Sequence, residues 1–125
     1  MNRKKHRWHA AIEKFEKIAA FWHPYIIGEL NENYIKIAKG KGELIWHSHE
    51  NEDELFIVIK GTLMMDFREK TLATMPGEIL IVPKGVEHRP WTNDEEVHFI
   101  MIEPKSLKHT GENIVDQTVE KLEWI

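Results

Sequence analysis

The sequence of 125 residues predicts an all-β domain, an antiparallel sandwich or barrel, with one short helix at its N-terminal end. Runs of about five to eight β-like residues follow one another between Tyr25 and Glu103, and turn-forming residues separate them. No stretch of about 10–15 helical residues interrupts these runs, as the crossovers of a parallel α/β sheet would require.

Composition narrows the class of protein further. Apolar residues make up 42% and charged residues 30% of the chain, which is typical of a single water-soluble domain. The absence of cysteine excludes disulfides, thiolate metal sites and cysteine nucleophiles. Four of the 17 basic residues lie in residues 1–7, which leaves 13 against 21 acidic residues, a balance that repels phosphate backbones. Because of this acidic balance, we expect no nucleic-acid partner. No apolar run approaches the roughly 18–20 residues that span a bilayer, so we expect no membrane contact and a cytoplasmic location.

Residues 8–22 form the predicted helix. Their apolar positions recur at spacings of three and four with Glu and Lys between them, which is the pattern of an amphipathic helix. These positions are Trp8, Ile12, Phe15, Ala19 and Trp22. Pro24 ends the helix, because the residue before a proline is pushed out of the helical region.

Eight strands are predicted after Pro24, where the apolar period changes to two. They are Tyr25–Leu30, Tyr34–Lys39, Glu43–His49, Glu54–Lys60, Thr62–Arg68, Lys70–Met75, Glu78–Val82 and Val97–Glu103. We therefore divide the chain into a tail and helix (1–24), a β-barrel (25–103) and a C-terminal segment (104–125). The residues of this segment expected to pack on the barrel are Val115, Val119, Leu122 and Trp124.

Three side chains with metal-binding chemistry fall in one predicted hairpin. His47 and His49 are two residues apart on a strand, so they project from the same face, while Trp46 and Ser48 point the other way. Glu54 opens the next strand after an acidic turn. Antiparallel pairing can bring its carboxylate beside the two imidazoles.

His88 supplies a third imidazole from a second hairpin. The strand before it ends in the turn from Pro83 to Gly85, and a further strand begins at His88. Three imidazoles and one carboxylate at one point suit a divalent first-row metal, and an octahedral ion would keep two positions open for water, substrate or dioxygen. In the alternative interpretation the four groups share a hydrogen-bonded core without an ion, which is costly unless every group is paired.

The spacing of these residues resembles the two motifs of the cupin superfamily. The family's ligand positions match His47, His49, Glu54 and His88, and its turn positions match Gly61, Gly77, Pro83 and Gly85. Two details depart from the family pattern: four residues rather than five separate Gly42 from His47, and Thr92 stands where an asparagine is usual. The short interval between the motifs, residues 62–76, resembles the compact single-domain, RmlC-like cupins and their mannose-6-phosphate isomerase-like group.

The resemblance implies a double-stranded β-helix, also called a jelly roll or cupin barrel. It also implies one divalent transition metal (Mn, Fe, Zn, Ni or Co) and a homodimer. Two functions follow as expectations. The first is a metalloenzyme acting on a small polar metabolite, either an oxidoreductase such as a dioxygenase or an isomerase of the sugar-phosphate type. The second is a binding module that captures a carbohydrate or small metabolite without turnover.

Five further residues are candidates for lining the pocket, although aromatic and methionine side chains in a β-barrel are mostly core. They are Phe56, Met65, Trp91, His98 and Met101. The remaining histidines have no motif around them, and we expect them at the surface: His6, His9, His23 and His109. The sequence identifies no second carboxylate that must enter the barrel.

Overall fold

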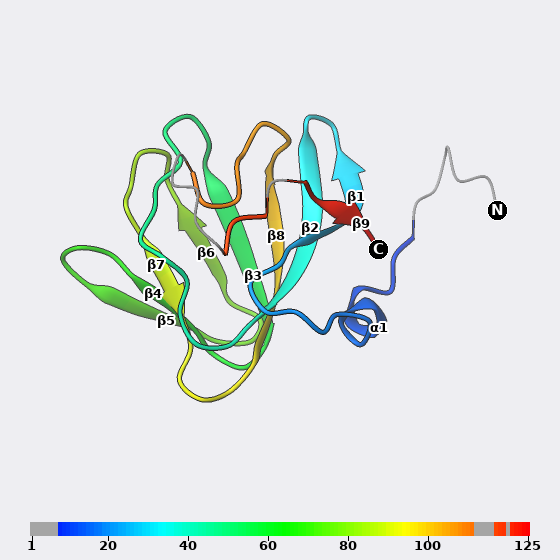
Figure 1. Cartoon of the computed structure of the whole chain (residues 1–125), viewed down its shortest axis with the longest axis horizontal. Helices are drawn as coiled ribbons and strands as arrows, with labels where there is room; N and C mark the ends of the chain where they lie inside the picture. The colour runs from blue at the N-terminus through cyan, green and yellow to red at the C-terminus, as the bar shows by residue number, and fades with distance from the viewer. Residues whose placement is uncertain (1–7, 112–116, 120) are drawn as a thin grey trace.

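The alternating apolar residues fold into two sheets that face each other, as the computed structural model shows for residues 8–111, 117–119 and 121–125 (Figure 1). The elements are α1 (Ala11–Phe15), β1 (Tyr25–Leu30), β2 (Asn33–Gly40), β3 (Glu54–Lys60), β4 (Leu63–Asp66), β5 (Thr71–Thr74), β6 (Ile79–Val82), β7 (Arg89–Trp91), β8 (Val97–Pro104) and β9 (Glu123–Trp124). One sheet has the order β6-β3-β8-β2-β1-β9 and the other β5-β4-β7. The prediction of an all-β jelly roll with one short helix is confirmed.

The core lies between the two sheets because β3 and β8 alternate strictly between buried and half-buried residues. Phe56 and Val58 of β3 face inward, and so do Phe99 and Met101 of β8. A second, smaller cluster covers part of the outer face of the larger sheet, at β1 and β2, where Phe15 of α1 packs with its neighbours. The other buried members of this cluster are Ile18, Ile27 and Ile37.

The helix prediction is wrong in length. Only Ala11–Phe15 is helical, and no side chain caps its first turn. The backbone at Trp22 has a left-handed φ of 56°, and its N–H donates to the Lys39 carbonyl, so the chain has already turned toward β2. The Trp22 ring packs over Gly40, where a Cβ would lie 2.4 Å from it. The apolar spacing at Phe15 and Trp22 therefore reflects tertiary packing, while Trp8 is 75% exposed.

The strand predicted over Glu43–His49 is also wrong, because only isolated bridges occur there. Glu43 pairs with Trp91 and His47 pairs with His88. Between these pairs Pro90 lies on the opposite segment, and a proline has no N–H to donate to a regular ladder. Its carbonyl still accepts a hydrogen bond from the Leu44 N–H. The segment keeps an extended course beside β7 without becoming a regular strand.

The C-terminal segment returns to the larger sheet through β9, which pairs in parallel with β1. Leu122 and Val119 are half-buried, as predicted packing residues would be, but Trp124 is 56% exposed and only its ring edge contacts Tyr34. Val115 lies outside the described residues. In the described ranges no helix has the length and apolar character needed to cross a membrane.

Two glycines with positive φ lie in turns that differ in how closely the surrounding backbone packs. Gly61 (φ 76°) joins β3 to β4, and a Cβ there would lie 2.2 Å from the Glu96 carbonyl oxygen, whereas Gly77 (φ 85°) has open space around it. Gly77→Ala should lower the free energy of unfolding by about 1–2 kcal/mol, the cost of a left-handed conformation. Gly61→Ala should cost more than about 3 kcal/mol, because the backbone must also move. Equal losses in urea unfolding would contradict this assignment.

Candidate metal centre

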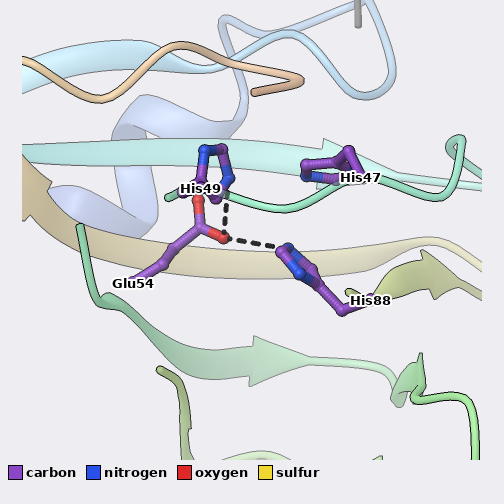
Figure 2. A group of neighbouring side chains, drawn as sticks. All are labelled: His47, His49, Glu54 and His88. Carbon is purple, nitrogen blue, oxygen red and sulfur yellow. Dashed lines mark ion pairs between the residues drawn. The ribbon is translucent and has the colours of Figure 1, made fainter. Parts of the chain in front are cut away.

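Three separate segments bring the cluster together. His47 and His49 come from the extended segment before β3, Glu54 is the first residue of β3, and His88 immediately precedes β7. The backbones of His47 and His88 are joined by two hydrogen bonds. The His47 N–H donates to the His88 carbonyl at 3.0 Å, and the His88 N–H donates to the His47 carbonyl at 2.9 Å. Figure 2 shows the four side chains converging, with dashed lines from Glu54 to His49 and His88. Register between distant segments therefore sets the spacing of the imidazoles.

The cluster is buried and compact. One nitrogen or oxygen atom from each of His47, His49, Glu54 and His88 lies within 4.8 Å of all the others. The Oε1 atom of Glu54 is 3.6 Å from Nε2 of His49 and 3.4 Å from Nε2 of His88. None of the four residues is more than 4% exposed. Such a group of donor atoms is close enough to share one ion.

Backbone carbonyls fix two of the imidazoles in the tautomer that a metal needs. The Nδ1 atom of His47 is 2.9 Å from the Ile45 carbonyl, and Nδ1 of His88 is 2.9 Å from the Val86 carbonyl. A carbonyl can only accept a hydrogen bond, so each Nδ1 carries the proton. The lone pair of each Nε2 therefore remains free and faces the cluster, the arrangement seen when histidine binds metal.

Several polar atoms of the cluster are buried with no hydrogen-bond partner among the residues that the structure describes. They are Nδ1 and Nε2 of His49, Oε1 of Glu54 and Nε2 of His88. An orphaned buried polar atom costs about 1–3 kcal/mol, and more where the group is charged. This observation argues against the ion-free alternative, which requires every group to be paired. The donor set fits a divalent transition ion, which would satisfy one orphaned atom of each of His49, Glu54 and His88.

Burial and neighbouring charges perturb the cluster in a consistent direction. Burial, followed by the proximity of His88, lowers the pKa of His47 from 6.5 to about 4. Burial acts to raise the pKa of Glu54, but the imidazoles of His49 and His88 outweigh it and hold this pKa well below its usual range. Near pH 7 the cluster therefore presents a neutral His47 beside an ionised carboxylate, which is the state that binds a cation.

A second carboxylate, not identified from the sequence, enters the barrel. Glu103 of β8 is 1% exposed, and its Oε1 lies 2.5 Å from Nζ of the equally buried Lys36 on β2. Burial and the adjacent Glu54 raise the pKa of Glu103 well above its usual range. A proton retained on Glu103 relieves the repulsion between the two carboxylates. The alternation that places Phe99 and Met101 inside predicts Glu103 there too, so this signal was present in the sequence.

A small cavity adjoins the cluster. The space open to the centre of a water molecule is about 20 Å³, enough for one water. His47, Glu54 and His88 line it, as do two of the predicted pocket residues, Phe56 and Met101. Its other lining residues are Trp22, Pro24, Ala38, Leu44, Pro90, Phe99 and His109.

The other predicted pocket residues lie elsewhere. Met65 is fully buried in the core between the sheets. Trp91 donates its Nε1–H to Asp66 Oδ1 at 2.7 Å. His98 faces the opposite side of β8 from Met101 and stacks on the Phe15 ring, with centroids 5.0 Å apart. None of these three lines the cavity.

His109 was expected at the surface, but it lies in the cavity wall. Burial lowers its pKa from 6.5 to about 4. No periodic pattern surrounds His109, because it belongs to an irregular segment whose course depends on contacts with the barrel. The sequence held no local signal for its position.

The comparison with known families agrees with this geometry. Residues 33–103, more than half of the chain, match the cupin domain family. The chain belongs to the cupin family. The buried cluster of His47, His49, Glu54 and His88 lies within the matched residues and is compatible with a divalent metal.

Two solved structures and one curated protein are similar to this cupin. A cupin-2 domain containing protein from Shewanella frigidimarina NCIMB 400 is 40% identical, with a TM-score of 0.73 over 75% of this chain and 91% of that chain. Protein NMB1881 from Neisseria meningitidis is 25% identical, with a TM-score of 0.72 over 79% and 100% of the two chains. YdbB from Bacillus subtilis (strain 168) is 41% identical over 66 residues, which are 52% of this chain and 58% of YdbB. The chain thus spans less than two thirds of the curated relative it matches.

The low pKa of His47 predicts acid sensitivity of the metal-free protein. Below about pH 6.5 an unfolded His47 takes up a proton, while the folded one stays neutral down to about pH 4. The unfolded state then binds more protons, so the free energy of unfolding falls as pH decreases from about 6.5 to 4, by on the order of 3 kcal/mol from His47. Urea unfolding in a chelator across this range measures the slope.

His47→Gln should reduce the slope of unfolding free energy against pH, by an amount that corresponds to at most one fewer proton taken up on unfolding. His98→Gln removes a histidine outside the cluster and serves as the matched control, since it should leave the His47 contribution in place. An identical slope for wild type and His47→Gln would show that His47 does not fold in its neutral form.

Proposed function

We propose that this cupin is a metalloenzyme that binds one divalent transition ion (Mn, Fe, Zn, Ni or Co) and acts on a small polar metabolite. His47, His49, Glu54 and His88 would hold the ion. When bound, such an ion polarises substrate oxygens or exchanges electrons with dioxygen. The side chains of the barrel hold the ligand atoms in place and exclude bulk water.

One observation carries this proposal. The cluster combines buried donor atoms that lack partners with an adjoining cavity, so an ion there would keep a side that faces open space. A metal held only for structure is usually enclosed by protein ligands. The imidazoles of His47 and His88 support the same conclusion, because their Nδ1 atoms are held by carbonyls and no donor among the described residues bonds to their Nε2 lone pairs.

Titratable groups near the cavity favour an enzyme over a binding module. A site built only for capture needs no acid or base, and an apolar wall would suffice. Here Glu103 lies against Glu54, and His109 lines the cavity beyond the cluster. Both can hold a proton close to a ligand of the ion, as acid–base chemistry requires. Capture of a carbohydrate or other metabolite without turnover is the second candidate.

The character of the cavity favours an oxidoreductase over an isomerase. Its volume of about 20 Å³ suits a molecule the size of water or dioxygen, and most of its wall is aromatic or aliphatic. A sugar phosphate would need a larger and more polar space beside the ion. A wider pocket of about 540 Å³ lies outside, with His109 in the wall of both, and its size suits a small metabolite.

Substitution of the ligands tests the metal site. His47→Ala or His88→Ala should reduce metal stoichiometry from about one ion per chain to a small fraction, because each removes one of four donors. Ser48→Ala, whose hydroxyl contacts Glu50 on the other side of the segment, should keep the ion. Elemental analysis after metal-free purification and reloading measures this, and thermal unfolding checks the fold. Full retention in both histidine variants would place the ion elsewhere.

Dioxygen uptake across a panel of small metabolites then separates the reaction classes. Uptake by the iron- or manganese-loaded protein, lost in His88→Ala, is the expected result. A zinc-loaded protein that retains a ligand tightly without uptake would favour the isomerase or the binding module instead.

A homodimer through the outer face of the larger sheet is part of the proposal. Cross-strand register places two aliphatic rows side by side across β6, β3 and β8. The rows are Ile81, Leu55 and Ile102, and Ile79, Ile57 and Ile100. Ile79 and Ile81 are 60% and 55% exposed, and β6 is the edge strand of the sheet. A contiguous apolar patch of this kind is typical of an interface, and a second copy offers a self-complementary one.

Charges placed on this patch should separate the dimer. Ile79→Lys combined with Ile81→Lys is expected to shift the mass in light scattering from two chains to one. Ile12→Lys, on α1 and 70% exposed, is the matched control and should leave the mass unchanged. A wild-type protein that is monomeric at micromolar concentration would reject the interface.

We propose a cytoplasmic location on the absence of cysteine alone.

A further inference from the structure

The segment that follows β8 packs against the backbone of the histidine cluster. The Leu107 side chain is buried, and its N–H donates to the Pro104 carbonyl at 3.0 Å. At the other end, Gly111 has a φ of 62°, and a Cβ there would lie 2.0 Å from the carbonyl oxygen of Ser48, the residue between His47 and His49. The chain from Leu107 to Gly111 is therefore packed against the backbone that carries two of the clustered imidazoles.

This packing places His109 in a defined protonation state. Its Nδ1 accepts a hydrogen bond from the backbone N–H of Val119 at 2.9 Å. An acceptor nitrogen carries no proton, so in a neutral ring the proton is on Nε2. Burial holds the pKa of His109 at about 4, which is consistent with a neutral ring near pH 7. Among the described residues, no hydrogen bond engages this Nε2–H.

His109 is also the one free polar donor in the wall of the inner cavity, as far as the described residues show. The wall beyond the cluster is otherwise apolar, apart from Trp22, whose indole N–H is used by the Lys41 carbonyl. Val119, the donor to Nδ1, lines only the outer pocket, and His109 lines both spaces. With Nδ1 turned toward Val119, Nε2 is the nitrogen left for a ligand.

We propose that His109 is a further ligand-binding residue of the site, whose Nε2–H donates a hydrogen bond to an oxygen anion, such as a carboxylate, that occupies the cavity beside the ion. This inference rests on the proposed metal-dependent function and adds a specificity determinant to it. The ion and His109 would grip the two oxygens of a carboxylate from different sides. The carboxylate would fill the inner cavity, and the rest of a small ligand would lie in the wider pocket, whose wall also includes His109.

Formate is a suitable probe because it is the smallest carboxylate. The protein is loaded with Co²⁺, whose visible spectrum reports binding, and formate is then titrated into wild type and variants. His109→Phe removes the donor and should weaken formate binding at least about tenfold, as expected for loss of a hydrogen bond to a charged group. Co²⁺ affinity should stay within about twofold of wild type.

His109→Gln and His98→Phe are the matched variants. Glutamine can present an amide N–H near the position of Nε2, so formate affinity should stay within about threefold of wild type. His98→Phe removes an imidazole outside the cavity and should change neither formate nor Co²⁺ binding. In the zinc-loaded wild type, the ¹⁵N resonances of His109 should show a proton on Nε2 that shifts when formate is added. This measurement needs no variant to fold.

The outcomes separate the inference from the function on which it rests. A wild-type protein that does not bind Co²⁺ would overturn the proposed function, and this inference with it. Co²⁺ binding without formate binding, or equal formate affinity in His109→Phe, would overturn the inference alone. Loss of Co²⁺ in His109→Phe would also overturn it, because His109 would then belong to the metal site. An unchanged His109 resonance would do the same.

Discussion

The structure depends on the cost of holding three imidazoles and a carboxylate together inside an apolar barrel. Charged and polar groups lose hydration when they are buried, and the loss is large unless partners replace the water. Here several of the cluster's nitrogen and oxygen atoms have no partner in the described part of the chain. The strict alternation of β3 and β8, with its apolar residues, supplies the opposing stability. The unfavourable free energy of burying these four groups is therefore offset by apolar burial across the whole sheet, which is typical of a functional site.

The Lys36–Glu103 pair follows from the same constraint. A carboxylate beside Glu54 would be repelled in a medium of low dielectric unless its charge is balanced. Lys36 contacts Glu103 on one side and Glu54 lies on the other. Because Glu103 retains a proton, a neutral group separates the Lys36 cation from the ionised Glu54. Removing one of these buried groups leaves a charge uncompensated. The buried polar groups thus extend beyond the four clustered residues.

Local patterning predicted the parts of the protein whose side chains alternate. The bounds of β1 and β3 were predicted to the residue, and parity within the two hairpins placed all four clustered side chains together. The failures have physical causes outside that pattern. A regular strand over residues 43–49 needs a backbone N–H on the opposite segment, and Pro90 has none. Trp22 fits the apolar spacing of a helix, but it is apolar because its ring packs on Gly40. Glu103 has the parity of Phe99 and Met101, but this parity was not applied to it in the prediction.

His109 is the instructive failure, because no local rule applies to it. Its position depends on the close approach of Gly111 to Ser48 and on the Val119 N–H, both of them contacts between segments far apart in sequence or irregular in structure. Pairing between segments places the four clustered side chains, because the backbones of His47 and His88 bond to each other and Glu54 begins β3. Parity and pairing could therefore predict these four residues from the sequence. The segment from Leu107 to Gly111 is irregular and follows no such period, so its contribution to the cavity wall is evident only in the folded chain.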